Sequence, residues 1–239
     1  MTETIPAALA AAVRRDPTTP LLTWYDDATG DRTELSGATM DNWVAKTANL
    51  LADGAGLAVG DPVAVLLPPH WQTAAILLGA WAAGTTAHLG PEPHPVDVLF
   101  TSPAGIEAAA TWQAGDRYAT GLLPLAMPLR ELPAGYADYT IEVRGYGDRF
   151  VPYQPVDADD PALPGRSHRD VSRTAAARAE ELGMTAGARV LIDAARHPDP
   201  ADWLLAPLFA GASVVLCANL DPAALDKRVE SENVTLTLA

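Results

Sequence analysis

Short apolar runs alternate with helical patterns along most of the chain, and glycine or proline separates them. The predicted strands are 62–67, 85–89, 96–101, 189–192, 213–216 and 234–238. The predicted helices are 9–15, 40–51, 71–83, 170–182 and 200–209, with a short one after Pro222. A hairpin is predicted where 21–25 and 32–35 flank a turn that ends at Gly30. Helices that alternate with short apolar strands predict an α/β fold of mostly parallel sheet covered by helices.

Residues 90–165 are less regular than the segments on either side. Proline and glycine recur there, and 139–143 reads as an isolated strand. The polar stretch from Asp157 to Pro161 interrupts the pattern and suggests a boundary. We therefore expect a first α/β unit with an irregular extension over 1–156 and a second unit over 157–239, either as two domains or as one compact domain.

The chain also contains an internal repeat. Residues 57–89 align without a gap on 184–216, and nine of the 33 positions are identical. Gly84 and Gly211 each follow a predicted buried helix, where glycine takes the left-handed conformation freely. The repeat predicts two copies of one α/β unit with positive φ at both glycines. The alternative is two unrelated units with similar turn chemistry.

Composition narrows the classes of function. The formal net charge of −14 over 239 residues opposes binding to nucleic acid or to an anionic membrane surface. No apolar segment is long enough to span a bilayer, and the first fifteen residues lack the pattern of a secretory signal. The single cysteine, Cys217, lies in an apolar run and is expected to be a buried thiol. We expect a soluble, cytoplasmic protein.

Candidate catalytic chemistry is sparse. The five histidines follow no metal-ligand spacing, so no metal site is predicted. Asp159 and Asp160 stand beside Pro161 and are interpreted as a solvated loop instead of a carboxylate pair. There is no Gly-x-Ser-x-Gly nucleophile motif. No catalytic residue and no cofactor are predicted.

Several segments resemble the large domain of adenylate-forming enzymes, the acyl-CoA synthetase or AMP-binding superfamily. They appear in that family's order at 22–25 with 33–35, 57–68, 79–89, 159–163, 167–171 and 208–216. Asp159-Asp160-Pro161-Ala162 is similar to the "D-D-P-A" that precedes the family's phosphate loop, and Ser167-His168 is similar to the "S-H" that follows it. The resemblance implies two similar α/β halves, which agrees with the repeat.

The departures from the family carry as much information as the matches. Only Pro164-Gly165-Arg166 stands where the family has a Ser/Thr/Gly-rich loop ending in Pro-Lys-Gly. The later nucleotide-binding segments and the small C-terminal domain have no counterpart before Ala239. The resemblance therefore implies a truncated large domain, a pseudoenzyme that does not adenylate acids. By family position His168 would line an acyl pocket, whereas its ordinary role is a polar residue in the first turn of a helix.

Three function classes follow from this interpretation. The favoured one is a non-catalytic module that binds a small molecule, such as an acyl-type ligand, or a protein partner. The others are an enzyme with a repurposed pocket and a subunit completed by a separately encoded chain. Because the parent fold would cover the strands left at the sheet edge, we also expect a homodimer.

Overall fold

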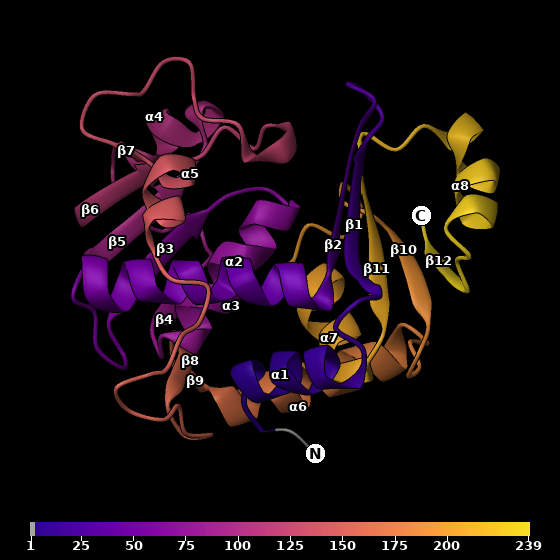
Figure 1. Ribbon diagram of the computed structural model, residues 1–239, viewed down its shortest axis with the longest axis horizontal. Coiled ribbons are helices and arrows are strands. Elements are labelled where there is room, and N and C mark those ends of the chain that lie inside the picture. Colours follow the sequence, from indigo (N-terminus) through magenta and orange to yellow (C-terminus); the bar gives the residue numbers. More distant parts are fainter. Residues whose placement is uncertain (1–2) are drawn as a thin grey trace. The chain divides into compact units, whose positions relative to one another are not determined.

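The computed structural model describes residues 3–239, and these form two compact units that are interleaved in sequence (Figure 1). Unit 1 contains 3–40, 69–71 and 170–239, and unit 2 contains 41–68 and 72–169. These units differ from the expected contiguous segments 1–156 and 157–239. The difference arises because the N-terminal hairpin pairs with a strand from the last part of the chain, where Leu22 lies opposite Val214.

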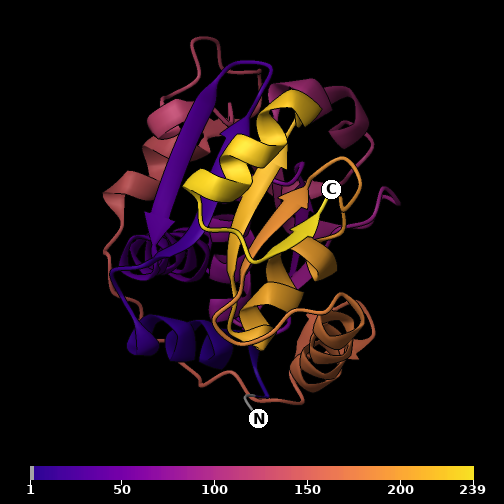
Figure 2. The same ribbon diagram turned by 90° about the vertical axis from the view of Figure 1, so that its right-hand side faces the viewer.

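Unit 1 is built on a five-stranded sheet of order β12-β10-β11-β1-β2. Its strands are β1 (Pro20–Asp26), β2 (Asp31–Ser36), β10 (Arg189–Asp193), β11 (Ser213–Ala218) and β12 (Leu236–Leu238). Only the β1–β2 pair is antiparallel. Its helices are α1 (Ile5–Arg15), most of α6 (His168–Glu181), α7 (Ala206–Ala210) and α8 (Leu225–Ser231), with a π-helical segment at Ala201–Leu205 and a 3-10 segment at Pro222–Ala224. Figure 2 looks onto this sheet, with α8 in front of its strands.

Unit 2 contains a second five-stranded sheet, of order β4-β3-β5-β6-β7 and parallel throughout. Its strands are β3 (Pro62–Leu66), β4 (Thr86–His88), β5 (Val96–Thr101), β6 (Ala114–Ala119) and β7 (Ala137–Asp138). The helices are most of α2 (Gly37–Asn49) and of α3 (Trp71–Ala82), α4 (Ile106–Ala109) and α5 (Tyr139–Glu142). A π-helical segment lies at Leu50–Gly54, and 3-10 segments lie at Pro103–Gly105, Pro124–Ala126 and Val143–Gly145. A small hairpin, β8 (Pro161–Leu163) and β9 (Arg166–Ser167), completes the unit.

The repeat predicted from the sequence is confirmed in the backbone. Gly84 and Gly211 have φ of +81° and +74°. The N–H of Gly60 donates to the carbonyl of Gly84 at 2.9 Å, and in the other copy Gly187 donates to Gly211 at 3.0 Å. The strand registers agree as well, since Pro62 pairs with Thr86 in unit 2 and Arg189 with Ser213 in unit 1, both shifted by the offset of the sequence alignment.

The irregular middle differs from the prediction at several elements, including α4, β7 and the β8–β9 hairpin, and two further cases show why. The segment expected as a strand at 139–143 is helical, because the carboxylate of Asp138 accepts from the backbone N–H of Thr140 at 2.8 Å and caps α5. The strand β6 was not predicted. Its sequence, Ala-Gly-Asp-Arg-Tyr-Ala, has a weak intrinsic strand preference, and it forms by pairing with β5 on one side and β7 on the other.

Replacing Gly84 with alanine should destabilise unit 2 by about 2–3 kcal/mol. An L-residue in the left-handed region costs about 1–2 kcal/mol, and the new Cβ would lie 2.9 Å from Cγ2 of Val59. Gly30 is a matched control, because its φ is +79° and a Cβ added there would meet nothing within 4 Å. Urea unfolding should show a larger loss for Gly84→Ala than for Gly30→Ala, and equal losses would contradict the packing argument.

Candidate ligand-binding site

A cavity of about 440 Å³ lies beside the β8–β9 hairpin in unit 2. Its volume falls in the range of ordinary small-molecule sites. The walls are mostly apolar and come from β4, the β4–β5 connection, the turn before β6 and the hairpin: Ala87, Leu89, Pro91, Trp112, Leu163 and Pro164. Gly90 and four side chains with polar ends complete the lining, and these four are His88, Glu92, His94 and Arg166.

The β8–β9 hairpin has a two-residue turn. Leu163 pairs with Arg166, so only Pro164 and Gly165 connect the strands, and Gly165 has the positive φ of +69°. The hairpin is anchored in the unit because Nε1 of the buried Trp81 donates to the carbonyl of Ala162 at 2.9 Å. In the family that the sequence resembles, a phosphate-binding loop stands at the position of this hairpin turn.

The two histidines of the cavity lie close together. The ring centroids of His88 and His94 are 5.3 Å apart, and His94 meets the ring of Trp112 edge-on at 6.2 Å. Burial, together with the neighbouring His94, lowers the pKa of His88. The guanidinium of Arg117 donates to the backbone carbonyl of Trp112 and holds the turn that carries this ring. The cavity thus combines the aromatic wall of Trp112 with the imidazoles of His88 and His94 and the guanidinium of Arg166.

His168, the residue that the resemblance implies for an acyl pocket, is fully buried at the start of α6. Burial lowers its pKa to about 4, although the nearby Asp160 favours the charged form. Its backbone N–H donates to the carbonyl of Asp160 at 3.0 Å. It is not among the residues that line the cavity beside the hairpin, and its place in an acyl pocket stays a prediction.

The remaining histidines lie in unit 1. His70 is buried with its ring centroid 4.3 Å from that of Trp24, and burial lowers its pKa to about 3. His197 contacts a carboxylate oxygen of Asp202 through Nδ1 at 2.8 Å, and Arg178 pairs with the same carboxylate at 2.7 Å. Within residues 3–239, no three histidine, cysteine or acidic side chains gather as a metal ion would require.

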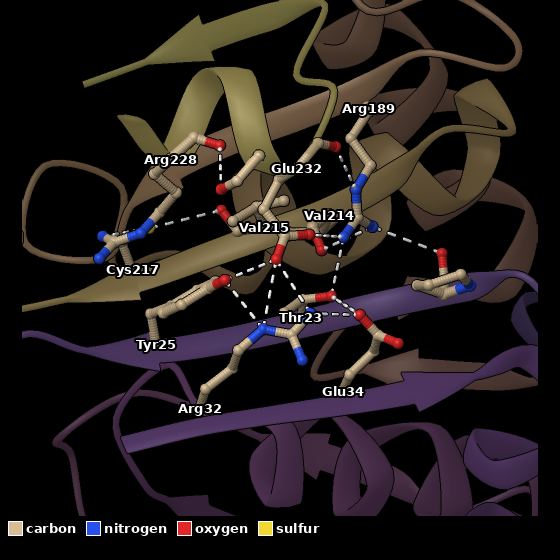
Figure 3. A network of polar contacts seen from close by, with 12 residues as sticks. Thr23, Tyr25, Arg32, Glu34, Arg189, Val214, Val215, Cys217, Arg228 and Glu232 are labelled. Carbon is tan, nitrogen blue, oxygen red and sulfur yellow. Dashed lines mark hydrogen bonds and ion pairs between the residues drawn. The ribbon is translucent and has the colours of Figure 1, made fainter. Parts of the chain in front are cut away.

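A second polar constellation lies on the sheet of unit 1 and centres on Glu232, which follows α8 (Figure 3). Its carboxylate accepts from the hydroxyl of Tyr25 at 2.5 Å and pairs with Arg32 at 3.0 Å and with Arg189 at 2.5 Å. Burial alone would raise the pKa of Glu232, but the hydrogen bonds from Tyr25, Arg189 and Arg32 outweigh it and keep that pKa below its usual range. The carboxylate is therefore ionised and held by three partners.

Arg228, in the last turn of α8, contacts the same part of the sheet. It pairs with Asp27 at 2.5 Å and lies over the ring of Tyr25, 4.2 Å from its centroid. Its guanidinium also reaches Sγ of Cys217 at 3.5 Å, but burial raises the pKa of this thiol to about 11, so it stays protonated at neutral pH. We interpret the constellation as a structural clamp, because its charges are paired within the protein.

The cavity-lining side chains were not predicted from the sequence, although the internal repeat pointed to one of them, His88. At the alignment offset, His88 corresponds to Val215, which is completely buried in β11. A polar residue in one copy thus stands where the other copy has a core residue, which marks the site at which the units have diverged. Arg166 and Trp112 had no comparable signal, because only folding brings them beside His88.

Comparison with solved structures shows the fold. An acyl-CoA synthetase from Brucella canis matches 96% of this chain and 46% of its own length, with a TM-score of 0.73 and 19% identity. A fatty acyl CoA synthetase from Mycobacterium tuberculosis matches 98% of this chain and 49% of its own length, with a TM-score of 0.68 and 17% identity. The chain therefore has the α/β fold of the front part of acyl-CoA synthetases and spans about half the length of these enzymes.

Comparison at the sequence level gives the family. No family model matches the chain. In the part of the chain that the structure describes, no helix combines the length and apolar character needed to cross a membrane. A "TIGR03089 family protein" from Mycobacterium tuberculosis is 44% identical over 248 residues, an alignment that covers 98% of this chain and 100% of that protein. At this identity and coverage, the chain belongs to the TIGR03089 family.

Proposed function

We propose that this protein is a binding module built on the acyl-CoA synthetase fold and that it does not adenylate carboxylic acids. The observation that carries the proposal is the two-residue turn of the β8–β9 hairpin, which joins Leu163 to Arg166. Recognition of ATP phosphates calls for a run of oriented backbone amides together with a lysine or another cation. Pro164 has no amide hydrogen, and Gly165 alone cannot form such a cradle.

The overall charge supports the same proposal. A triphosphate that approaches this chain meets a formal net charge of −14. Without a loop that neutralises the phosphates locally, this field disfavours nucleotide binding. The cavity beside the hairpin supports a small-molecule ligand in its place, because it has the size of a ligand site and a largely apolar wall.

We expect no acid-dependent exchange of pyrophosphate into ATP above a no-enzyme blank, across a panel of short, long and aromatic carboxylic acids. A full-length acyl-CoA synthetase assayed alongside provides the positive control. Equilibrium dialysis with ATP and Mg²⁺ should likewise show no saturable binding at millimolar nucleotide. Exchange that depends on one of the acids would overturn the proposal, and saturable ATP binding would remove its main argument.

A further inference from the structure

We propose that the cavity beside the β8–β9 hairpin binds a small ligand with an oxyanion head, a carboxylate or a phosphate ester, and an apolar body. The inference rests on the proposed function, since it names the ligand class of the binding module. It assigns the head to the His88, His94 and Arg166 side and the body to the Trp112 side.

The polar side of the cavity favours an anion. Arg166 supplies a permanent positive charge, and the two imidazoles supply ring nitrogens that can donate hydrogen bonds. Glu92 is the one acidic residue of the lining. In a chain with 16 Lys and Arg against 30 Asp and Glu, this lining is less acidic than the chain as a whole, because its one arginine balances its one glutamate and its two histidines add hydrogen-bond donors. Charge-assisted hydrogen bonds to an oxyanion are the strong ones in proteins.

The apolar side limits the ligand to one with a hydrophobic body. Trp112 is buried and belongs to the same core cluster as Val96, Leu99 and Ala109. Leu163 and Pro164 of the hairpin contribute further apolar surface to the lining. A free inorganic anion would leave these surfaces uncovered, whereas a phenyl or short alkyl group would bury them.

The placement of His88 adds an independent argument. Its strand pairs in register with β3, where Ala64 lies opposite His88 and is packed in the same core cluster as Trp112. A half-buried histidine next to such a core costs stability relative to the valine found in the other copy. A ligand that uses the imidazole accounts for a polar residue at this position.

Titration with phenyl phosphate and with benzoate tests the proposal on the complete protein. Imidazole C–H resonances should be followed by NMR for all five histidines. We expect the signals of His88 and His94 to shift saturably with at least one of these probes, and those of His70, His168 and His197 to stay in place. Response to phenyl phosphate alone assigns a phosphate ester, and response to benzoate alone assigns a carboxylate.

Arg166→Gln should weaken the responding probe at least about tenfold, because it removes a charged donor. His94→Gln, a change at an exposed position, should weaken it several-fold and keeps the test decisive if Arg166→Gln fails to fold. Arg130→Gln removes an exposed positive charge outside the cavity and should leave binding unchanged. Circular dichroism confirms that each variant is folded.

Three results would overturn the inference: no saturable shift with either probe, equal shifts with benzyl alcohol, or equal affinity for inorganic phosphate. None of these results would bear on the proposal that the protein does not adenylate carboxylic acids. Conversely, acid-dependent pyrophosphate exchange would contradict the proposed function without moving the histidine signals. The two proposals therefore fail separately.

Discussion

Replacing Glu232 with glutamine should lower the free energy of unfolding of unit 1 by about 3 kcal/mol. The carboxylate is 8% exposed and compensates two guanidiniums, those of Arg32 and Arg189. Removal of one partner from a buried ion pair leaves an uncompensated charge, which costs about 3–5 kcal/mol. Glutamine keeps part of the hydrogen bonding, so the lower end of that range is expected. Urea unfolding monitored by circular dichroism measures the loss.

Glu181→Gln is the matched control for this experiment. Glu181 also pairs with an arginine, Arg178, at 3.0 Å, but its side chain is 65% exposed. Exposed pairs contribute about 0–1 kcal/mol. If Glu232→Gln costs no more than Glu181→Gln, the clamp does not hold α8 on the sheet.

Lowering the pH from 7 to 5 should destabilise each unit by about 2 kcal/mol through one buried histidine. The folded-state pKa is about 3 for His70 in unit 1 and about 4 for His168 in unit 2, and burial is the main cause of both shifts. An unfolded histidine has a pKa near 6.5. The unfolded chain therefore binds more protons below that value, and stability falls as the pH drops from about 6.5 toward the folded-state pKa.

Unfolding in urea at pH 7 and pH 5 tests this expectation. His70→Gln should remove about 2 kcal/mol of the pH-dependent loss in unit 1, while His94→Gln, at an exposed position, controls for the removal of an imidazole. A His70→Gln variant that keeps the full wild-type loss in unit 1 would show that His70 does not exclude its proton in the folded state.

The repeated elements could be predicted from the sequence because two local signals agree in each copy. The apolar runs identify β3 and β10, and a glycine ends each following helix. Gly84 and Gly211 both have a positive φ, a backbone conformation that strongly favours glycine over other residues. Local conformational preference and burial thus point to the same structure, which makes the prediction reliable.

The irregular middle could not be predicted in the same way. The residues 139–143 look like a strand, and only the hydrogen bonds from Thr140 to the carboxylate of Asp138 favour a helix. The strand β6 depends on neighbours that are remote in sequence from one another, β5 and β7. In both cases a single side chain or a tertiary pairing outweighs the local pattern.

The candidate site could not be predicted from the sequence, for a related reason. His88 and His94 are near each other in sequence, but Arg166 comes from the β8–β9 hairpin and Trp112 from the turn before β6. Their spacing matches no metal or catalytic motif, because the cavity is made by loops from separate parts of the unit. The family resemblance contributed only the absence of a phosphate loop, which agrees with the short turn at Pro164 and Gly165.

The pairing of β1 with β11 affects the order in which the parts of the chain can fold during synthesis. Residues 41–169, which hold all of the sheet of unit 2, are complete before β11 has been synthesised. Domains generally fold as units during synthesis, so the middle of the nascent polypeptide can fold first. Meanwhile the earliest strands, with Leu22 and Trp24, lack the partner that buries them in the finished protein. The β1–β2 hairpin therefore stays without its parallel partner until β11 has been synthesised, although it precedes unit 2 in the sequence.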